Sequence, residues 1–138
     1  MNNAIELALS IIKSSSNAII GSIDNDGYPN VKAMLEPREH DGIKKFYFTT
    51  NTSSMRVAQF KKNPKASLYF YNATSFRGLM LKGTMKVLED SETKERIWHN
   101  GDEMYYPKGV TDPDYCVLEF TAQNGRIYQN FSSENFEI

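Results

Sequence analysis

An anion-binding site is indicated by the segment Thr49–Arg56, which reads Thr-Thr-Asn-Thr-Ser-Ser-Met-Arg. The segment follows residues typical of a strand and precedes residues typical of a helix. The first N–H groups of a helix have no partner within the helix, and the helix dipole adds partial positive charge there. Serine and threonine hydroxyls add further hydrogen-bonding groups. The junction therefore suits a phosphate group.

Two basic residues are placed to serve such an anion. Arg56 lies in the first turn of the expected helix, where a cation is unfavourable by roughly 0.3–1 kcal/mol unless an anion lies nearby. A phosphate would offer its guanidinium a bidentate partner. Lys32 lies on an earlier strand that we expect to run beside this one. The alternative is an ordinary capped helix with Arg56 in solvent, and the local pattern by itself favours this simpler interpretation because serine-rich caps are common.

Other residue types that carry chemistry occur singly. His40 and His99 show no metal-ligand spacing with carboxylates or with Cys116, so the sequence predicts no metal site. Each histidine is interpreted as a surface or capping residue. Cys116 alternates with Leu118 and Phe120, which indicates core packing rather than a reactive thiol.

Composition narrows the class of protein. The chain has 138 residues, 17 acidic and 16 basic side chains and a formal net charge of −1, which argues against a general nucleic-acid or membrane-surface binder. No apolar run approaches the ~18 residues of a membrane span, and the first residues lack the basic region of a signal peptide. A lone cysteine cannot form an internal disulfide. We therefore expect a single domain over residues 1–138, located in the cytoplasm.

Hydrophobic spacing and turn residues predict the elements that must position these side chains. Helices are expected around residues 5–12, 55–62 and 91–98. Strands are expected over residues 17–24, 29–36, 45–50, 66–72, 78–88, 115–122 and 126–131. The last two would form a hairpin through a turn at Asn124-Gly125. Because short turns join only antiparallel strands, the sequence predicts a mainly β fold, an antiparallel barrel with flanking helices.

Several short motifs follow one another in an order typical of one family. They are Gly27-Tyr28-Pro29, Lys32-Ala33-Met34, Phe46-Tyr47-Phe48-Thr49-Thr50, Ser54-Met55-Arg56, Asn63-Pro64-Lys65-Ala66, Lys82-Gly83-Thr84 and Asp112-Pro113. In this set the chain resembles the pyridoxamine phosphate oxidase-like FMN-binding split barrels, and within them the general-stress-protein branch. The resemblance covers Asn17 to about Phe131 and implies an antiparallel barrel of six to seven strands.

The resemblance also implies a cofactor, FMN, and a homodimer with the flavin in a cleft between the protomers. It implies that a lysine and a helix start hold the phosphate, and that two strand segments contact the flavin ring and ribityl chain. The cofactor-binding residues carried over in this way are Lys32, Ala33, Met34, Thr49, Thr50, Ser54, Met55 and Arg56. No catalytic side chain is carried over. The implied function is that of an oxidoreductase acting with a small-molecule redox partner.

Departures from the family pattern bear on the substrate. The oxidase itself has a lysine for its phosphorylated substrate where this chain has Pro37, and its C-terminal arginine–histidine segment has no counterpart in residues 126–138. Tyr128 stands where many relatives carry tryptophan. Trp98 with Met104-Tyr105-Tyr106 would cover a flavin edge or pack the third helix, and packing is the simpler interpretation. Pyridoxamine phosphate oxidation is therefore not the expected reaction.

Three alternatives stay open. Bound flavin could serve storage or redox sensing without catalysis, and some split-barrel relatives bind haem, which would make a histidine a ligand. The third is an OB-like barrel that binds single-stranded nucleic acid, in which aromatic side chains stack on bases. The side chains available for stacking are Phe46, Tyr47, Phe48, Tyr69, Phe70 and Tyr71. The charge balance and the alternation of these residues in strands argue against this last alternative.

Overall fold

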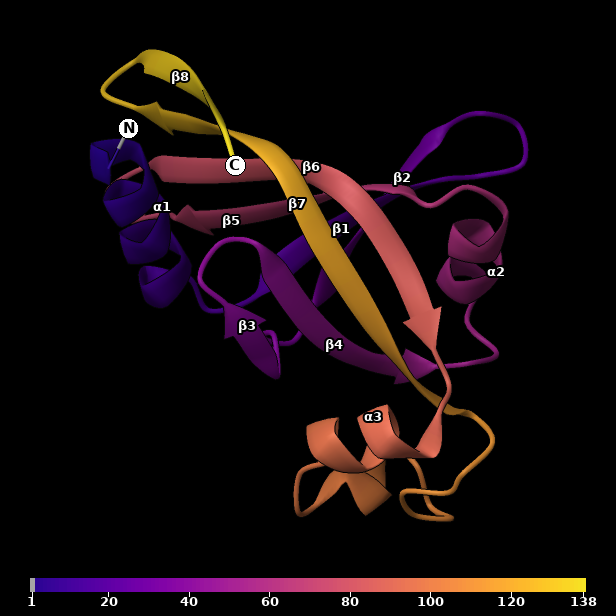
Figure 1. Cartoon of the computed structure of the whole chain (residues 1–138). Helices are drawn as coiled ribbons and strands as arrows, with labels where there is room; N and C mark the ends of the chain where they lie inside the picture. Colours follow the sequence, from indigo (N-terminus) through magenta and orange to yellow (C-terminus); the bar gives the residue numbers. More distant parts are fainter. Residues whose placement is uncertain (1) are drawn as a thin grey trace.

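The fold is mainly β, and the computed structural model describes residues 2–138 (Figure 1). Its helices are α1 (Asn2–Ser14), α2 (Met55–Lys62) and α3 (Ser91–Ile97), and a 3₁₀ turn covers Asp102–Met104. Its strands are β1 (Ala18–Ile23), β2 (Pro29–Met34), β3 (Glu39–Asp41), β4 (Lys45–Asn51), β5 (Lys65–Asn72), β6 (Arg77–Leu88), β7 (Tyr115–Gln129) and β8 (Ser132–Glu137). None of the helices in this range is long and apolar enough to cross a membrane.

All the strands belong to one antiparallel sheet. Its order is β2-β1-β5-β6-β7-β4-β3, and β8 adds to the free part of β7. The sheet is curled. Strands β4 and β5 are not neighbours in the order, yet Phe46 of β4 packs on Phe70 of β5 with ring centroids 5.5 Å apart. The predicted antiparallel, mainly β fold is confirmed.

Every second side chain along the strands points to the inside of the curled sheet and is buried there. In β4 the side chains of Phe46, Phe48 and Thr50 are buried while the residues between them are half-buried. Helix α1 covers one part of the sheet beside β5 and β6, with Ala8 and Ile11 buried. Figure 1 shows α3 well away from α1, next to the start of β7. The core thus forms from the inward face of the sheet and one stripe of α1.

The predicted hairpin at Asn124-Gly125 is wrong. Strand β7 runs unbroken through these residues, and its register with β6 shifts between Ala122, which lies opposite Gly83, and Asn124, which lies opposite Lys82. The turn-type residues therefore mark a β-bulge. Gly125 pairs with Leu81 and with Phe136, and the position requires a glycine because a Cβ there would lie 2.7 Å from Phe136 and 3.0 Å from Leu81.

The true turn follows β7 and leads into a strand that was not predicted. Asn130 and Phe131 have φ of 51° and 61°, which is the left-handed conformation of tight turns. Residues 2–138 form eight strands rather than six or seven. The two predicted strands 115–122 and 126–131 merge into β7, and the additional strands are β8 and the short β3.

Glycine at the bulge offers a test of this register. A Cβ on Gly83 would lie 1.9 Å from the backbone oxygen of Thr121, whereas a Cβ on Gly21 would meet nothing closer than 3.5 Å. We expect Gly83→Ala to lower the free energy of unfolding by about 3 kcal/mol or more, since the clash is with backbone. The control Gly21→Ala should change it by less than about 1 kcal/mol. Urea unfolding of the two variants measures both, and equal stabilities would contradict the register.

Candidate functional site

A hollow of about 460 Å³ lies between β2 and β4. Its size falls within the roughly 300–1,000 Å³ of small-molecule sites. Strand β2 is the first in the strand order and β4 is the last but one, so they lie near opposite edges of the sheet. Because the sheet is curled, residues of both strands line the hollow, although the two strands form no hydrogen-bonded pair. Its lining residues are Asn17, Lys32, Ala33, Met34, Leu35, Glu36, Arg38, Phe48, Thr49, Thr50, Asn51, Arg56, Tyr105 and Tyr106.

Helix α2 is held against both sides of this gap. The Oγ of Ser22 in β1 donates a hydrogen bond to Oε1 of Gln59 at 2.5 Å, and Nε2 of Gln59 donates to Oδ1 of Asn30 in β2 at 3.3 Å. The first turn of α2 directly follows β4. These bonds hold the second turn of α2 beside β1 and β2, and Arg56 in the first turn lines the same hollow as Lys32.

The loop before α2 has defined hydrogen bonds. Ser54 is the N-cap, and its side chain accepts a bond from the Val57 N–H. The Asp114 carboxylate accepts from the Ser53 N–H at 2.8 Å and from Nδ2 of Asn51 at 2.9 Å. Bonds from Ser53 and Asn51 lower the pKa of Asp114. The capped helix start is therefore rigidly placed, and sequence reasoning did not identify Asp114 as its anchor.

Arg56 carries a buried donor without an acceptor. Its Nε is buried and has no hydrogen-bond partner among residues 2–138. Burial lowers the pKa of Arg56, but a guanidinium keeps its charge in a protein. A buried unsatisfied donor costs about 1–3 kcal/mol. An anion bound in the hollow would give this donor the acceptor that the protein itself does not provide.

The structure brings six of the eight predicted cofactor residues to the hollow. Lys32, Ala33, Met34, Thr49, Thr50 and Arg56 all line it. Ser54 is occupied as the helix cap, and the side chain of Met55 is 68% exposed without lining the hollow. Whether these residues bind FMN stays a prediction.

Comparison with known proteins identifies the family. The family model for pyridoxamine 5'-phosphate oxidase matches residues 6–129. The chain belongs to the pyridoxamine 5'-phosphate oxidase family. A crystal structure of a Clostridium acetobutylicum protein related to general stress protein 26, described as of the pyridoxinephosphate oxidase family, is 42% identical with a TM-score of 0.90. That match covers 100% of this chain and 96% of the other.

More distant members of the family match in part of the sequence or in fold alone. The pyridoxine/pyridoxamine 5'-phosphate oxidase of Legionella pneumophila strain Lens is 29% identical over 75 residues, which make up 54% of this chain and 34% of that enzyme. An FMN-binding protein of Nostoc punctiforme related to pyridoxamine 5'-phosphate oxidase is 14% identical with a TM-score of 0.73. Its match covers 99% of this chain and 95% of the other. These likenesses confirm the split-barrel fold.

In this family member the hollow also has a wall that was only partly predicted. Tyr106 both lines the hollow and packs on Tyr115, with ring centroids 4.8 Å apart. Burial raises the pKa of Tyr106 and raises that of Tyr115 to about 12. Packing was the simpler interpretation of this aromatic segment, and the structure shows that packing and site lining go together.

Arg38 was missed by sequence reasoning. Its guanidinium forms a bidentate ion pair with Asp102, at 2.7 and 2.8 Å, and the two side chains are 11% and 5% exposed. The hydrogen bond with Asp102 raises the pKa of Arg38. Burial by itself would raise the pKa of Asp102, but bonds from Arg38 and the His99 N–H outweigh it and hold that pKa below its ordinary value. The pair fastens the aromatic wall to the segment after β2.

The histidines and the cysteine lie outside this hollow. Nδ1 of His40 lies 2.8 Å from the carbonyl oxygen of Gly42, and His99 is exposed. Cys116 is buried in the core, where burial raises its pKa. Within residues 2–138, no three His, Cys, Asp or Glu side chains are grouped so that they could hold a metal ion.

The ion pair predicts a pH-dependent stability. Because the native pKa of Asp102 is lowered, its contribution is present above the unfolded value of about 3.9 and is lost as the pH falls through the native pKa. Asp102→Asn should cost about 3–5 kcal/mol at pH 7, since it leaves a buried guanidinium unpaired. It should also flatten the acid limb of the stability curve.

Urea unfolding between pH 7 and pH 3 measures both effects. Glu89→Gln is the control, because Glu89 pairs with Lys61 on the surface, where both side chains are about half exposed and such pairs contribute about 0–1 kcal/mol. Equal losses in the two variants would show that the Arg38–Asp102 pair does not hold the wall.

Proposed function

We propose that the chain binds FMN in the hollow between β2 and β4 and acts as an FMN-dependent oxidoreductase. The observation that carries the proposal is the meeting of Lys32, the start of α2 and the unpartnered Nε of Arg56 at one hollow. These groups match a phosphate in charge and in hydrogen bonding. The family and its FMN-binding relative support the choice of cofactor.

The remaining lining residues suit the rest of such a cofactor. Ala33 and Met34 on β2 and Thr49 on β4 also line the hollow, with backbone groups and a hydroxyl for hydrogen bonds. Phe48 and Tyr106 are buried and add aromatic surface to the lining. Bound FMN would supply hydride transfer, so the protein's task is to orient it and tune its surroundings.

The chemistry required of the side chains is small. The ionisable groups that line the hollow are Lys32, Glu36, Arg38, Arg56 and two tyrosines. Arg38 is already paired with Asp102, and the phosphate would engage Lys32 and Arg56. This arrangement fits a flavin that carries the redox step itself, and it equally fits flavin storage or sensing.

We also propose that the functional form is a homodimer with the flavin at its interface. Val31 of edge strand β2 is 77% exposed, and Leu35, the residue after β2, is 63% exposed and lines the hollow. Exposed apolar groups on a sheet edge favour association. A second exposed set comprises Tyr69, Tyr71 and Phe76. A partner that covers these faces would enclose a hollow that is open on one protomer.

The nucleic-acid alternative receives less support. Of the aromatics proposed to stack on bases, Phe46, Phe48 and Phe70 are at most 1% exposed. Tyr69 and Tyr71 are exposed, with ring centroids 6.1 Å apart, but the formal net charge of the chain is −1. A charge-neutral surface lacks the phosphate attraction that such binding needs.

Loss of the phosphate cations should weaken FMN binding without unfolding the protein. Each charge-assisted contact contributes roughly 1.5–3 kcal/mol, so Lys32→Ala and Arg56→Ala should each raise the Kd about tenfold or more, and the double variant further. Flavin fluorescence titration measures the affinities. Lys62→Ala is the control, since Lys62 is exposed on the same helix but does not line the hollow.

An unchanged affinity in the folded double variant would contradict the placement of the phosphate. Denaturing the purified protein and weighing the released ligand by mass spectrometry gives an independent answer. Release of FMN supports the proposal, whereas release of haem or a deazaflavin would contradict the choice of FMN as the cofactor.

The dimer makes a separate prediction. Sedimentation velocity at micromolar concentrations with FMN should show a dimer, and Val31→Glu should shift the population toward monomer because it buries a charge at the edge of β2. A wild-type protein that stays monomeric with bound FMN would contradict the interface and leave the cofactor site intact.

A further inference from the structure

A second hollow adjoins the proposed flavin site. It measures about 420 Å³ and lies between α1, β5 and the segment that connects β2 to β3. Asn17 and Glu36 line both hollows. In the β1–β2 register Ala18 lies opposite Met34 and Ile20 opposite Lys32. The shared residues therefore stand at the end of the first hollow that lies away from the phosphate cations.

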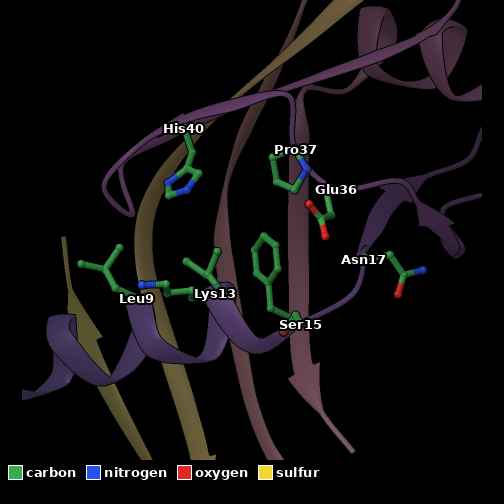
Figure 2. A pocket seen from close by; sticks show the side chains of 9 residues that line it. Leu9, Lys13, Ser15, Asn17, Glu36, Pro37 and His40 are labelled. Carbon is green, nitrogen blue, oxygen red and sulfur yellow. The ribbon is translucent and has the colours of Figure 1, made fainter. Parts of the chain in front are cut away.

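The second hollow has an apolar floor and polar edges. Its floor is formed by Leu9 and Ile12 of α1 with Phe70 of β5, and Pro37 lies across from α1. Figure 2 shows Lys13 and Glu36 on opposite sides of the hollow, with His40 and Pro37 across from α1. An apolar floor with one cation at its edge suits a ring that carries an acidic group.

Two groups at the edge are oriented by their surroundings. Lys13 lies in the last turn of α1, where the helix dipole favours a cation. The Nδ1 of His40 lies 2.8 Å from the Gly42 carbonyl oxygen, which only accepts, so Nδ1 carries the proton and Nε2 is left for a ligand. The imidazole is further held by stacking on Phe46 at 5.5 Å. His40 is thus held at the edge of the floor, and Lys13 adds an exposed cation there.

We propose that this second hollow binds a small aromatic acid, with its ring on the apolar floor and its carboxylate at Lys13. Because the hollow adjoins the end of the flavin site away from the phosphate cations, such a compound is placed as the substrate. The substrate role rests on the proposed FMN function, whereas the binding of the aromatic acid does not.

Titration of ¹⁵N-labelled full-length protein with 1-naphthoate tests the site. Amide signals of Leu9, Lys13 and His40 should shift and saturate, while that of Phe76 on the exposed aromatic surface stays in place. A shift confined to Phe76, or no shifts, would overturn the proposal.

Variants of the cation sharpen the result. Lys13→Gln should weaken 1-naphthoate binding roughly three- to tenfold, while Lys13→Arg should keep it. Glu6→Gln, on the same helix but outside the hollow, should have no effect. Neutral 1-naphthamide should bind wild type and Lys13→Gln alike. Equal 1-naphthoate affinity in wild type and Lys13→Gln would refute the role of Lys13.

A measurement with FMN separates the two proposals. In the FMN-loaded protein, 1-naphthoate should perturb the flavin absorption spectrum, because the two hollows share Asn17 and Glu36. Binding without spectral change would refute the substrate role. If FMN does not bind but 1-naphthoate behaves as expected, the proposed function fails and the second site stands.

Discussion

The meeting of β2, α2 and β4 at the open side of the curled sheet is the constraint on which the rest of the molecule depends. The three elements do not pair as strands there, so side chains must hold them together. Gln59 does this for α2, with bonds to Ser22 and Asn30 on β1 and β2, and Asp114 does it for the loop before the helix. The gap that remains is the hollow with Lys32 and Arg56.

One group at this site lowers the stability of the fold, because it is buried without a hydrogen-bond partner. Arg56 has a buried Nε without a partner in the part of the chain that the structure describes, and a buried unsatisfied donor destabilises a protein. The neighbouring Arg38 shows the contrast, since both of its terminal nitrogens bond to Asp102. One arginine thus holds the wall, while the other keeps a donor without a partner, which is the feature on which the proposed anion site rests.

Apolar surface on β2 and the second hollow beside Glu36 extend the same region outward. Leu35 lines the first hollow and Val31 is exposed on β2, while Glu36 also lines the second hollow with Leu9, Ile12 and Phe70. In the functions proposed above, cofactor, partner protomer and substrate would meet around this short strand and the residues after it.

The sequence by itself determined the local elements, the antiparallel fold class and the family, because periodicity, caps and motif order are written along the chain. It misplaced a turn at Asn124-Gly125, since turn residues also mark bulges, and only the pairing of these residues with β6 and β8 excludes a turn there. The sequence predicted Lys32 and Arg56 as binding residues, but the curl of the sheet is what places both of them at one hollow. Arg38–Asp102, Asp114 and the second hollow depend on contacts between residues far apart in sequence, which only the tertiary structure decides.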